Sequence, residues 1–318
     1  MTGETRAPTR EGTLEAARSI ALILPKTPLL PVEINGVSCH VKAENLQPIG
    51  AFKIRGAWWR LSNLSEQERA AGVVAVSSGN HAQGVAWAAK RLGINAVIVM
   101  PRDAPRVKLE NTKSLGAEVV LYNRPGEDRD EVAAKLIEER GGTLVHAFGD
   151  PWVIEGQGSA GVELFEQMGG DGPSQVLACC GGGGLAAGLE LACPEAAVHV
   201  VEPIGWDMVG QAIAAGRIVQ AGSDAPKTIC DALQPTATKS VNLDVLKDRA
   251  APGLTVTDDE VRTAQRWAFA NLRMVIEPGG AAALAAALAG KVELDARSVI
   301  MVTGGNADPV AFAQTIAA

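Results

Sequence analysis

The sequence has few aromatic residues: phenylalanine, tryptophan and tyrosine together make up 4% of its 318 residues. Glycine, with 35 residues, and alanine are common instead, a balance that suits helices packed closely on sheets better than an aromatic binding surface. Hydrophobic residues make up 47% of the chain, which is enough for a large core, and the length exceeds that of most single domains. We therefore expect an α/β protein with two domains.

An excess of positive charge is also missing. The formal net charge is −7 and the pI is about 5.3, so no global basic field would attract nucleic acid or anionic lipid. The N-terminal segment contains no apolar leader, and the alanine-rich run 279–290 is too short to cross a bilayer. We expect a cytoplasmic protein that binds a small molecule, with no nucleic-acid or membrane partner.

Paired cysteines and metal-ligand spacings are absent from the sequence as well. The cysteines are odd in number and form no CxxC pair, and they occur at Cys39, Cys179, Cys180, Cys193 and Cys230. The histidines are scattered along the chain at His40, His81, His146 and His199. We expect reduced thiols and no metal site.

From residue 73 onward, short β-branched runs alternate with alanine-rich segments of helical length, which is typical of parallel strands joined by crossover helices. The predicted strands are Val73–Ser77, Ala96–Met100, Glu118–Tyr122, Thr143–His146, Gln175–Cys179, Val198–Val201 and Ser298–Val302. The predicted helices are Asn80–Leu92, Arg106–Leu115, Arg129–Arg140, Glu155–Met168, Leu185–Leu191, Asp207–Ala215, Asp258–Ala270 and Ala281–Ala289. Ligands of such sheets bind beyond the carboxyl ends of the strands, so residues directly after strands are the candidates for ligand binding. The least regular stretch, 222–252, is expected near the mouth of the site.

Four consecutive glycines, Gly181–Gly184, stand between a predicted strand and a predicted helix. Glycines let the backbone approach an anion, and a helix N-terminus offers unpaired N–H groups with a favourable dipole, so this segment predicts a phosphate site. It lacks the Lys-Ser/Thr ending of a nucleotide P-loop, and Ala186 breaks the GxGxxG pattern of dinucleotide folds. A turn that merely allows close packing is the alternative interpretation.

The segment Ser77-Ser78-Gly79-Asn80-His81 occupies an equivalent place after another strand. Hydroxyl and amide groups beside exposed backbone donors suit a carboxylate. The alternative interpretation, in which Asn80 is a plain helix N-cap and His81 a surface residue, fits these residues equally well when they are taken alone.

Lys53 stands between apolar neighbours, Phe52 and Ile54. A desolvated lysine has a lowered pKa and forms imines, whereas the alternative is a surface lysine that extends its amine into water. Thr303 ends the last predicted strand and is followed by two glycines, which is also typical of a simple turn.

Together and in this order, these segments resemble the fold type II pyridoxal-phosphate enzymes, specifically the threonine/serine dehydratase (ammonia-lyase) and serine racemase family. The resemblance runs from about Thr27 to Asp308. It is carried by residues 42–47 (KAENLQ), 52–57 (FKIRGA), 77–84 (SSGNHAQG), 181–184 (GGGG), 154–158 (IEGQG), 201–203 (VEP), 276–280 (IEPGG) and 303–306 (TGGN).

The resemblance implies a pyridoxal 5'-phosphate cofactor that Lys53 holds as a Schiff base, and it makes the same lysine the group that moves the Cα proton. It implies further cofactor contacts from Phe52, Asn80, Glu277, Thr303 and the backbone of Gly181, Gly182, Gly183 and Gly184. The hydroxyl of Thr303 would meet the pyridine nitrogen. The substrate carboxylate would bind at Ser77, Ser78, Gly79, Asn80 and His81, with Ser78 matching the acid/base that serine racemases use on the opposite face.

The resemblance also implies a fold of two open, mostly parallel sheets flanked by helices. We expect residues 1–66 and 150–318 to form a large cofactor-binding domain and residues 67–149 a small domain that closes over the substrate, in a homodimer. The chain ends at Ala318, soon after the last motif, so no C-terminal regulatory domain is expected.

The sequence departs from the family pattern at two places. Ala51 stands where a serine is usual, which removes a hydroxyl from the cofactor site. In the segment that supplies divalent-cation ligands in many relatives Glu202 is present, but Met208 takes the place of the expected aspartate, with Asp207 one residue earlier. We therefore expect no magnesium site.

The chemistry expected from the resemblance is elimination. A 3-hydroxy amino acid such as L-threonine or L-serine would lose water and yield a 2-oxo acid and ammonia, because a neutral threonine hydroxyl at the pyridine nitrogen disfavours a long-lived carbanion. The alternatives are an amino-acid racemase, a dehydratase of a bulkier or acidic substrate such as phenylserine or 3-hydroxyaspartate, and a non-catalytic binding protein, which would not need Lys53.

Overall fold

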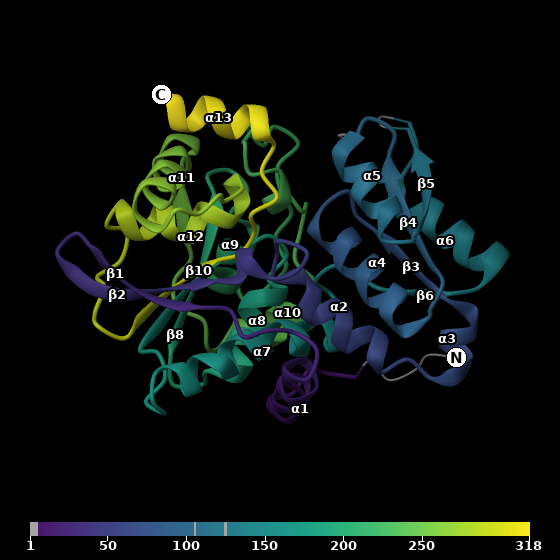
Figure 1. The fold of residues 1–318 in the computed structure, drawn as a ribbon, viewed down its shortest axis with the longest axis horizontal. Helices are drawn as coiled ribbons and strands as arrows, with labels where there is room; N and C mark the ends of the chain where they lie inside the picture. Colours follow the sequence, from purple (N-terminus) through teal and green to yellow (C-terminus); the bar gives the residue numbers. More distant parts are fainter. Residues whose placement is uncertain (1–5, 105, 124–125) are drawn as a thin grey trace.

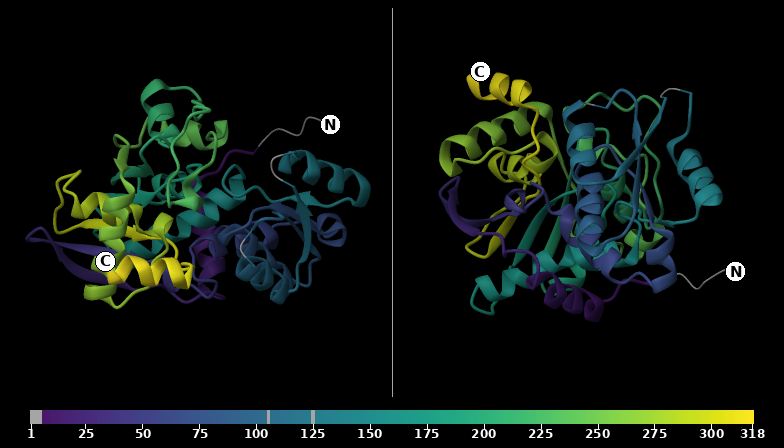
Figure 2. Two further views of the ribbon diagram at one scale, coloured as in Figure 1. Left: turned by 90° about the horizontal axis from the view of Figure 1, so that it is seen from above. Right: turned by 45° about the vertical axis from the view of Figure 1, so that its right-hand side comes forward.

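The computed structural model describes residues 6–104, 106–123 and 126–318 and contains two separate β-sheets with helices packed against them (Figure 1). The two further views in Figure 2 place the C-terminal helix on one side of the molecule and the smaller sheet with its helices on the other. The predicted α/β class with mostly parallel sheets is confirmed.

The larger sheet has six strands in the order β1-β2-β10-β7-β8-β9. They are β1 (Leu29–Ile34), β2 (Val37–Ala43), β7 (Gln175–Cys179), β8 (Ala197–Pro203), β9 (Leu254–Val256) and β10 (Ser298–Val302). All neighbours are parallel except β1 and β2, which form an antiparallel hairpin at one edge. Strands β7 and β10 are buried along their whole length, which explains their almost continuous apolar sequences.

The smaller sheet is parallel throughout, in the order β5-β4-β3-β6. Its strands are β3 (Val73–Val76), β4 (Ala96–Pro101), β5 (Glu118–Tyr122) and β6 (Thr143–Leu144). The predicted strand at 143–146 is shorter in the structure because it pairs with β3 over two residues only.

Eight helices lie close to their predicted bounds: α4 (Asn80–Leu92), α5 (Arg106–Ser114), α6 (Arg129–Arg140), α7 (Pro151–Gln167), α8 (Gly184–Ala192), α9 (Met208–Ala215), α11 (Asp258–Leu272) and α12 (Pro278–Leu288). The structure adds α1 (Arg10–Ala21), α2 (Lys53–Ser62), α3 (Glu66–Ala71), α10 (Ser240–Leu246), α13 (Pro309–Ala317) and the 3₁₀ turns η1 (Glu44–Leu46) and η2 (Asp231–Leu233). In the described ranges, no helix has both the length and the apolar character needed to cross a membrane.

Helix α2 lies between the two sheets and packs on both α4 and α7 (Figure 1). Its crossing with α7 is very close, because a Cβ on Gly156 would lie 2.6 Å from the Cα of Gly56. Glycine at both positions therefore sets the distance between these helices. The same two helices carry much of the buried polar network described next.

A fully buried guanidinium holds α2 in place. The Arg55 side chain donates to both carboxylate oxygens of Glu44, at 2.7 and 2.8 Å, and to both of Glu163, at 2.8 and 2.9 Å. Lys42 of β2 donates to Glu163 at 2.5 Å, so two cations and two carboxylates are paired inside the protein. Removal of one partner from such a set leaves an uncompensated buried charge, at a cost of about 3–5 kcal/mol. The network thus fixes the orientation of a helix that begins at Lys53.

Candidate active site

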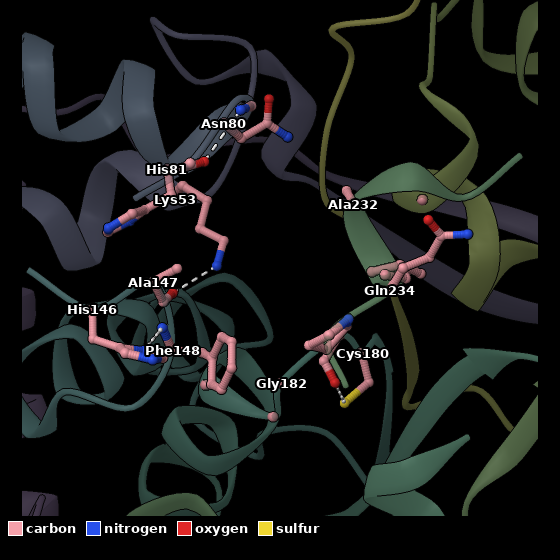
Figure 3. A pocket seen from close by; sticks show the side chains of 18 of the residues that line it. Lys53, Asn80, His81, His146, Ala147, Phe148, Cys180, Gly182, Ala232 and Gln234 are labelled. Atoms are coloured by element: carbon pink, nitrogen blue, oxygen red, sulfur yellow. Dashed lines mark hydrogen bonds between the residues drawn. The ribbon is translucent and has the colours of Figure 1, made fainter. Parts of the chain in front are cut away.

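A cavity of about 500 Å³ lies where segments following β3, β7 and β10 come together. It is lined by Phe52, Lys53, Glu277, Thr303, Ser77–His81 and Gly181–Gly184. All candidate site residues from the sequence therefore lie around one cavity. Residues 231–239, from the irregular stretch expected near the mouth, complete the wall opposite Lys53 (Figure 3).

Lys53 is the first residue of α2. Its side chain lines the cavity, and its amine points toward the backbone of Ala147, which lines the same cavity (Figure 3). Its Nζ donates a hydrogen bond to the Ala147 carbonyl at 2.8 Å. Burial lowers the pKa of the Lys53 amine to about 8, because a charged ammonium is poorly solvated there. The neutral amine, which acts as nucleophile and base, is therefore accessible near neutral pH.

The serine turn, Ser77–His81, joins β3 to α4. The Gly79 N–H donates to the Ser77 hydroxyl at 3.1 Å, which folds the turn around its own backbone. Ser78 lines the cavity and is partly exposed to it. Its last two residues, Asn80 and His81, are the first residues of α4, so the turn presents hydroxyl groups beside a helix N-terminus, an arrangement that suits a carboxylate.

His81 lines the same cavity, but its ring is buried and turned toward the chain that follows β6. Its Nε2 lies 2.8 Å from the carbonyl oxygen of Val145 and therefore donates the proton of this bond. Burial and the nearby Lys53 amine lower the pKa of His81 to about 3. The imidazole is neutral at physiological pH and brings no charge to the site.

Asn80 is held by hydrogen bonds on both sides of its amide. Its Nδ2 donates to the carboxylate of Glu277 at 2.5 Å, and its Oδ1 accepts from Asn306 at 2.7 Å. Asn306 also donates to the Ile49 carbonyl at 2.9 Å, which ties the group to the segment before α2. Burial raises the pKa of Glu277 to about 7, so this carboxyl group carries only part of its charge near neutrality.

The glycine loop, Gly181–Gly184, connects β7 to α8. Gly183 has φ +91°, a left-handed conformation that disfavours any side chain, and a Cβ on Gly182 would lie 2.3 Å from the Phe148 ring. Within the described part of the chain, no hydrogen-bond acceptor is found for the N–H groups of Gly181, Gly182 and Gly184. Unpaired N–H groups at the start of a helix form a site for an anion.

Thr303 lies at the carboxyl end of β10 and is buried. Its carbonyl accepts from the Phe52 N–H at 3.1 Å, so the strand end is bonded directly to the residue before Lys53. The Thr303 hydroxyl lies beside the Cys179 thiol, whose pKa is raised to about 11 by burial. The thiol and the hydroxyl are both uncharged at neutral pH, and Thr303 lines the cavity.

These residues fit the cofactor implied by the sequence motifs. The aldehyde of pyridoxal phosphate needs an amine of lowered pKa, which Lys53 supplies, and the phosphate needs donors without other partners, which the glycine loop supplies. A neutral hydroxyl for the ring nitrogen is present in Thr303. The cavity is large enough to hold a cofactor of this size together with a small amino acid.

Glu202, singled out as a potential cation ligand, bonds to the protein itself. Its two carboxylate oxygens accept the N–H groups of Val209 and Gly210 at 3.0 and 2.8 Å, and burial raises its pKa to about 8. Met208 is buried, and Asp207 accepts from Gln211 at 3.0 Å. Among the described residues, no group of three or more histidine, cysteine, aspartate or glutamate side chains is placed to hold a metal ion.

Sequence reasoning missed several residues of the cavity wall, notably Phe148, Asp231 and Thr238. Phe148 packs against Gly182 beneath the lysine, as Figure 3 shows. Phe148 follows the predicted strand Thr143–His146 by two residues, so its place after a strand was a signal that could have found it, whereas no motif marked Asp231 or Thr238. Only the predicted location of the irregular stretch pointed toward two of them.

Known proteins resemble this chain over almost its whole length. Residues 20–304 match the family model described as pyridoxal-phosphate dependent enzyme. A serine racemase of Schizosaccharomyces pombe is 39% identical over 95% of each chain, and an L-threo-3-hydroxyaspartate ammonia-lyase of Saccharomyces cerevisiae is 36% identical over 97% of this chain and 96% of its own. The solved structure of a threonine deaminase from T.th. has a TM-score of 0.87 at 40% identity, covering 95% of this chain and 99% of that one.

Proposed function

We propose, since the chain belongs to the family of pyridoxal-phosphate-dependent enzymes, that it is a dehydratase of L-3-hydroxy amino acids of the threonine or serine type. Pyridoxal phosphate is the cofactor of this family. The observation that carries the proposal is the meeting, around one cavity, of a lysine of lowered pKa, unpaired loop N–H groups and a buried neutral hydroxyl.

The proposed contacts with the cofactor follow from these positions. The glycine loop would hold the phosphate, Lys53 the aldehyde carbon, and Thr303 the ring nitrogen, with Phe52, Asn80 and Glu277 around the remaining edge. When bound, pyridoxal phosphate withdraws electrons from the substrate Cα and so weakens its C–H bond. The chain's own residues then decide which bond breaks next.

The serine turn would hold the substrate carboxylate, and the neutral Lys53 amine would take the Cα proton. The β-hydroxyl would then leave as water with the proton that Lys53 took from Cα, and the released enamine is hydrolysed to a 2-oxo acid and ammonia. Proton transfer by a well-placed amine is worth about 10²- to 10⁴-fold in rate. A Thr303 hydroxyl at the ring nitrogen would stay neutral and would not protonate the ring, which favours loss of the β-hydroxyl over return of a proton to Cα.

Two candidates share the same cofactor residues. Racemisation is favoured by Ser78, which lines the cavity where a second acid/base is needed, and by the name of the fission-yeast relative. An acidic substrate such as 3-hydroxyaspartate is favoured by Arg129 and Lys239, two further cations of the cavity wall, and by the name of the budding-yeast relative.

A panel of 3-hydroxy amino acids tests the proposal directly. Purified protein with pyridoxal phosphate is incubated with L-serine, L-threonine, L-threo-3-hydroxyaspartate and phenylserine, and 2-oxo acid, ammonia and D-amino acid are all measured. We expect 2-oxo acid and ammonia in equal amounts and well above D-amino acid. A predominance of D-amino acid would assign a racemase instead.

Ser78→Ala separates the two reactions within the same protein. Elimination from the L-substrate needs only Lys53, so its rate should change little. Any D-product should fall much more strongly, since the opposite face loses its proton donor. Lys53→Ala serves as the control that abolishes both reactions. Borohydride reduction followed by peptide mass analysis should find the cofactor on Lys53 in the natural sequence and in Ser78→Ala, and no attached cofactor in Lys53→Ala.

A further inference from the structure

The glycine loop is contacted from a segment of the chain that carries none of the family motifs. Thr238 lies two residues before α10, and its side chain is buried, with 3% of the residue exposed. Its hydroxyl donates a hydrogen bond to the carbonyl oxygen of Gly182 at 3.0 Å. This bond joins positions 56 residues apart and is made to the loop proposed to receive the phosphate.

A second contact reaches the loop from the same segment. The Asn242 side chain, fully buried in α10, donates to the Phe148 carbonyl at 2.9 Å. The Phe148 ring in turn packs on Gly182, where it would lie 2.3 Å from a Cβ. The peptide of Gly182 is therefore held on one side by a hydroxyl and on the other by a ring that α10 anchors.

The hydrogen bond from Thr238 to the Gly182 carbonyl also affects the direction of the following N–H group, that of Gly183. In a trans peptide the C=O and the following N–H point to opposite sides, so fixing the Gly182 carbonyl also fixes the direction of the Gly183 N–H. Glycines on both sides leave this peptide plane otherwise free to rotate, since neither residue restricts φ and ψ as a side chain would. The Gly183 N–H is bonded to the Cys180 thiol, so the Gly182–Gly183 peptide is held at both ends, and the N–H groups of Gly181, Gly182 and Gly184 on either side of it stay without a partner in the described part of the chain.

We propose that Thr238 is a positioning residue that holds the Gly182–Gly183 peptide, and with it the glycine loop, so that the unpaired N–H groups of the loop face the cofactor phosphate. The inference rests on the proposed function, and it assigns to the irregular stretch a task in cofactor binding that the motifs do not contain. Thr238 does not touch the reacting atoms. It acts by keeping an N–H donor in place before the phosphate arrives, which lowers the conformational cost of binding.

The experiment compares two ligands that differ only in the phosphate. Apoenzyme of the natural sequence, of Thr238→Val and of Thr238→Ser is titrated with pyridoxal phosphate and with pyridoxal, and binding is followed by absorbance. Loss of one oriented donor should weaken pyridoxal phosphate about tenfold in Thr238→Val. Pyridoxal should bind equally well to all three, and Thr238→Ser, which keeps the hydroxyl, should restore most of the affinity for pyridoxal phosphate.

Inorganic phosphate provides a second probe without the ring. It should compete with pyridoxal phosphate in the natural sequence and compete less well in Thr238→Val. Thr263→Val is the matched control, because its hydroxyl also donates to a backbone carbonyl, that of Asp259 at 2.9 Å, but on the exposed surface of α11. Thr238→Ala removes the same hydroxyl with less bulk and replaces Thr238→Val in every comparison if that variant fails to fold.

Three results would overturn the inference: unchanged affinity for pyridoxal phosphate in Thr238→Val, an equal loss for pyridoxal, or no recovery in Thr238→Ser. An equal loss for both ligands would mean that Thr238 only supports the general shape of the cavity. Failure of the proposed function looks different, because the natural sequence would then bind pyridoxal phosphate without releasing 2-oxo acid from any hydroxy amino acid.

Discussion

Lys53 combines a buried amine with a hydrogen bond to a backbone carbonyl, and this makes its reactivity depend on pH. With a pKa of about 8, the ammonium form predominates at pH 7 and the neutral amine above pH 8. Only the neutral amine attacks an aldehyde, so the rate at which apoenzyme captures pyridoxal phosphate should rise with pH through a midpoint near 8. Stopped-flow absorbance between pH 6 and 10 measures this rate; a midpoint near the ordinary lysine pKa of about 10.4 would contradict the burial described.

Glu202 leads to a prediction about divalent cations. Its oxygens already accept two backbone N–H groups at the start of α9, and the raised pKa of about 8 leaves the carboxyl group largely protonated at pH 7. A protonated carboxyl is a poor ligand for magnesium, which prefers charged oxygen ligands. Activity after exhaustive treatment with EDTA should therefore stay within about twofold of the untreated rate.

The control for the EDTA experiment is readdition of Mg²⁺ to the treated enzyme, with Asp207→Asn assayed in parallel. A large loss that Mg²⁺ restores, and that Asp207→Asn reproduces, would show that Glu202 and Asp207 bind a cation after all.

At this scale the sequence predicted which residues gather around the cavity but not how their side chains turn. Lys53 and Thr303 could be predicted because each lies beside a strand end or in an apolar motif, where the position in the sequence alone indicates a ligand site. The inward rotation of His81 depends on a carbonyl 64 residues away, and the contact of Thr238 with Gly182 spans 56 residues. Such contacts follow from the packing of whole elements, which local sequence does not contain.

The loop between β7 and α8 is the element in which backbone conformation and proposed ligand binding meet. Gly183 has φ +91°, and a Cβ there would also approach Leu246 to 3.3 Å. Gly183→Ala should cost about 1–2 kcal/mol of stability from the left-handed conformation alone. It should in addition weaken binding of pyridoxal phosphate, because a shift of a few tenths of an ångström, in Leu246 or in the loop, must relieve the contact and a methyl group is added beside the loop N–H groups.

Gly216→Ala is the matched control for this prediction. Gly216 ends α9 with φ +63° and has no atom within 4 Å of a potential Cβ, so its replacement carries the conformational cost without the contact. Thermal unfolding should show similar losses for the two variants, whereas titration with pyridoxal phosphate should separate them. Equal cofactor affinity in both would remove the glycine loop from the proposed site.

Elements with a strong periodic pattern were predicted well, and those with short or unusual patterns were missed. Buried parallel strands such as β7 and β10 have an unmistakable apolar sequence. The hairpin of β1 and β2 was missed although its turn, Asn35-Gly36, is a strong signal, with φ values of 52° and 78°. Helix α2 was missed because Gly56 weakens its helical pattern, and that glycine is explained only by the close crossing with α7.

At the scale of the whole molecule, we propose that residues 67–149 close as a small domain over the substrate, against a large domain of residues 1–66 and 150–318. An ion pair crosses between these parts at the cavity wall: Lys108 of α5 donates to Asp231 of η2 at 2.7 Å. The Lys108 side chain is 23% exposed and that of Asp231 61%, so the pair is screened by water and adds at most about 1 kcal/mol.

An energy of that size matters little for folding but changes the population of a closed state several-fold. Asp231→Asn should therefore leave the melting temperature within a few degrees and raise the KM for the amino-acid substrate about two- to fivefold at low ionic strength. The difference should vanish in about 1 M NaCl, where the screening length falls to roughly 3 Å.

Glu110→Gln is the matched control. It breaks the exposed pair with Arg106 within α5, at 2.6 Å, and this pair does not join the two proposed domains. A KM that is unchanged in Asp231→Asn, or raised equally in Glu110→Gln, would show that this ion pair does not assist closure, since only a contact between the moving parts should respond in this way.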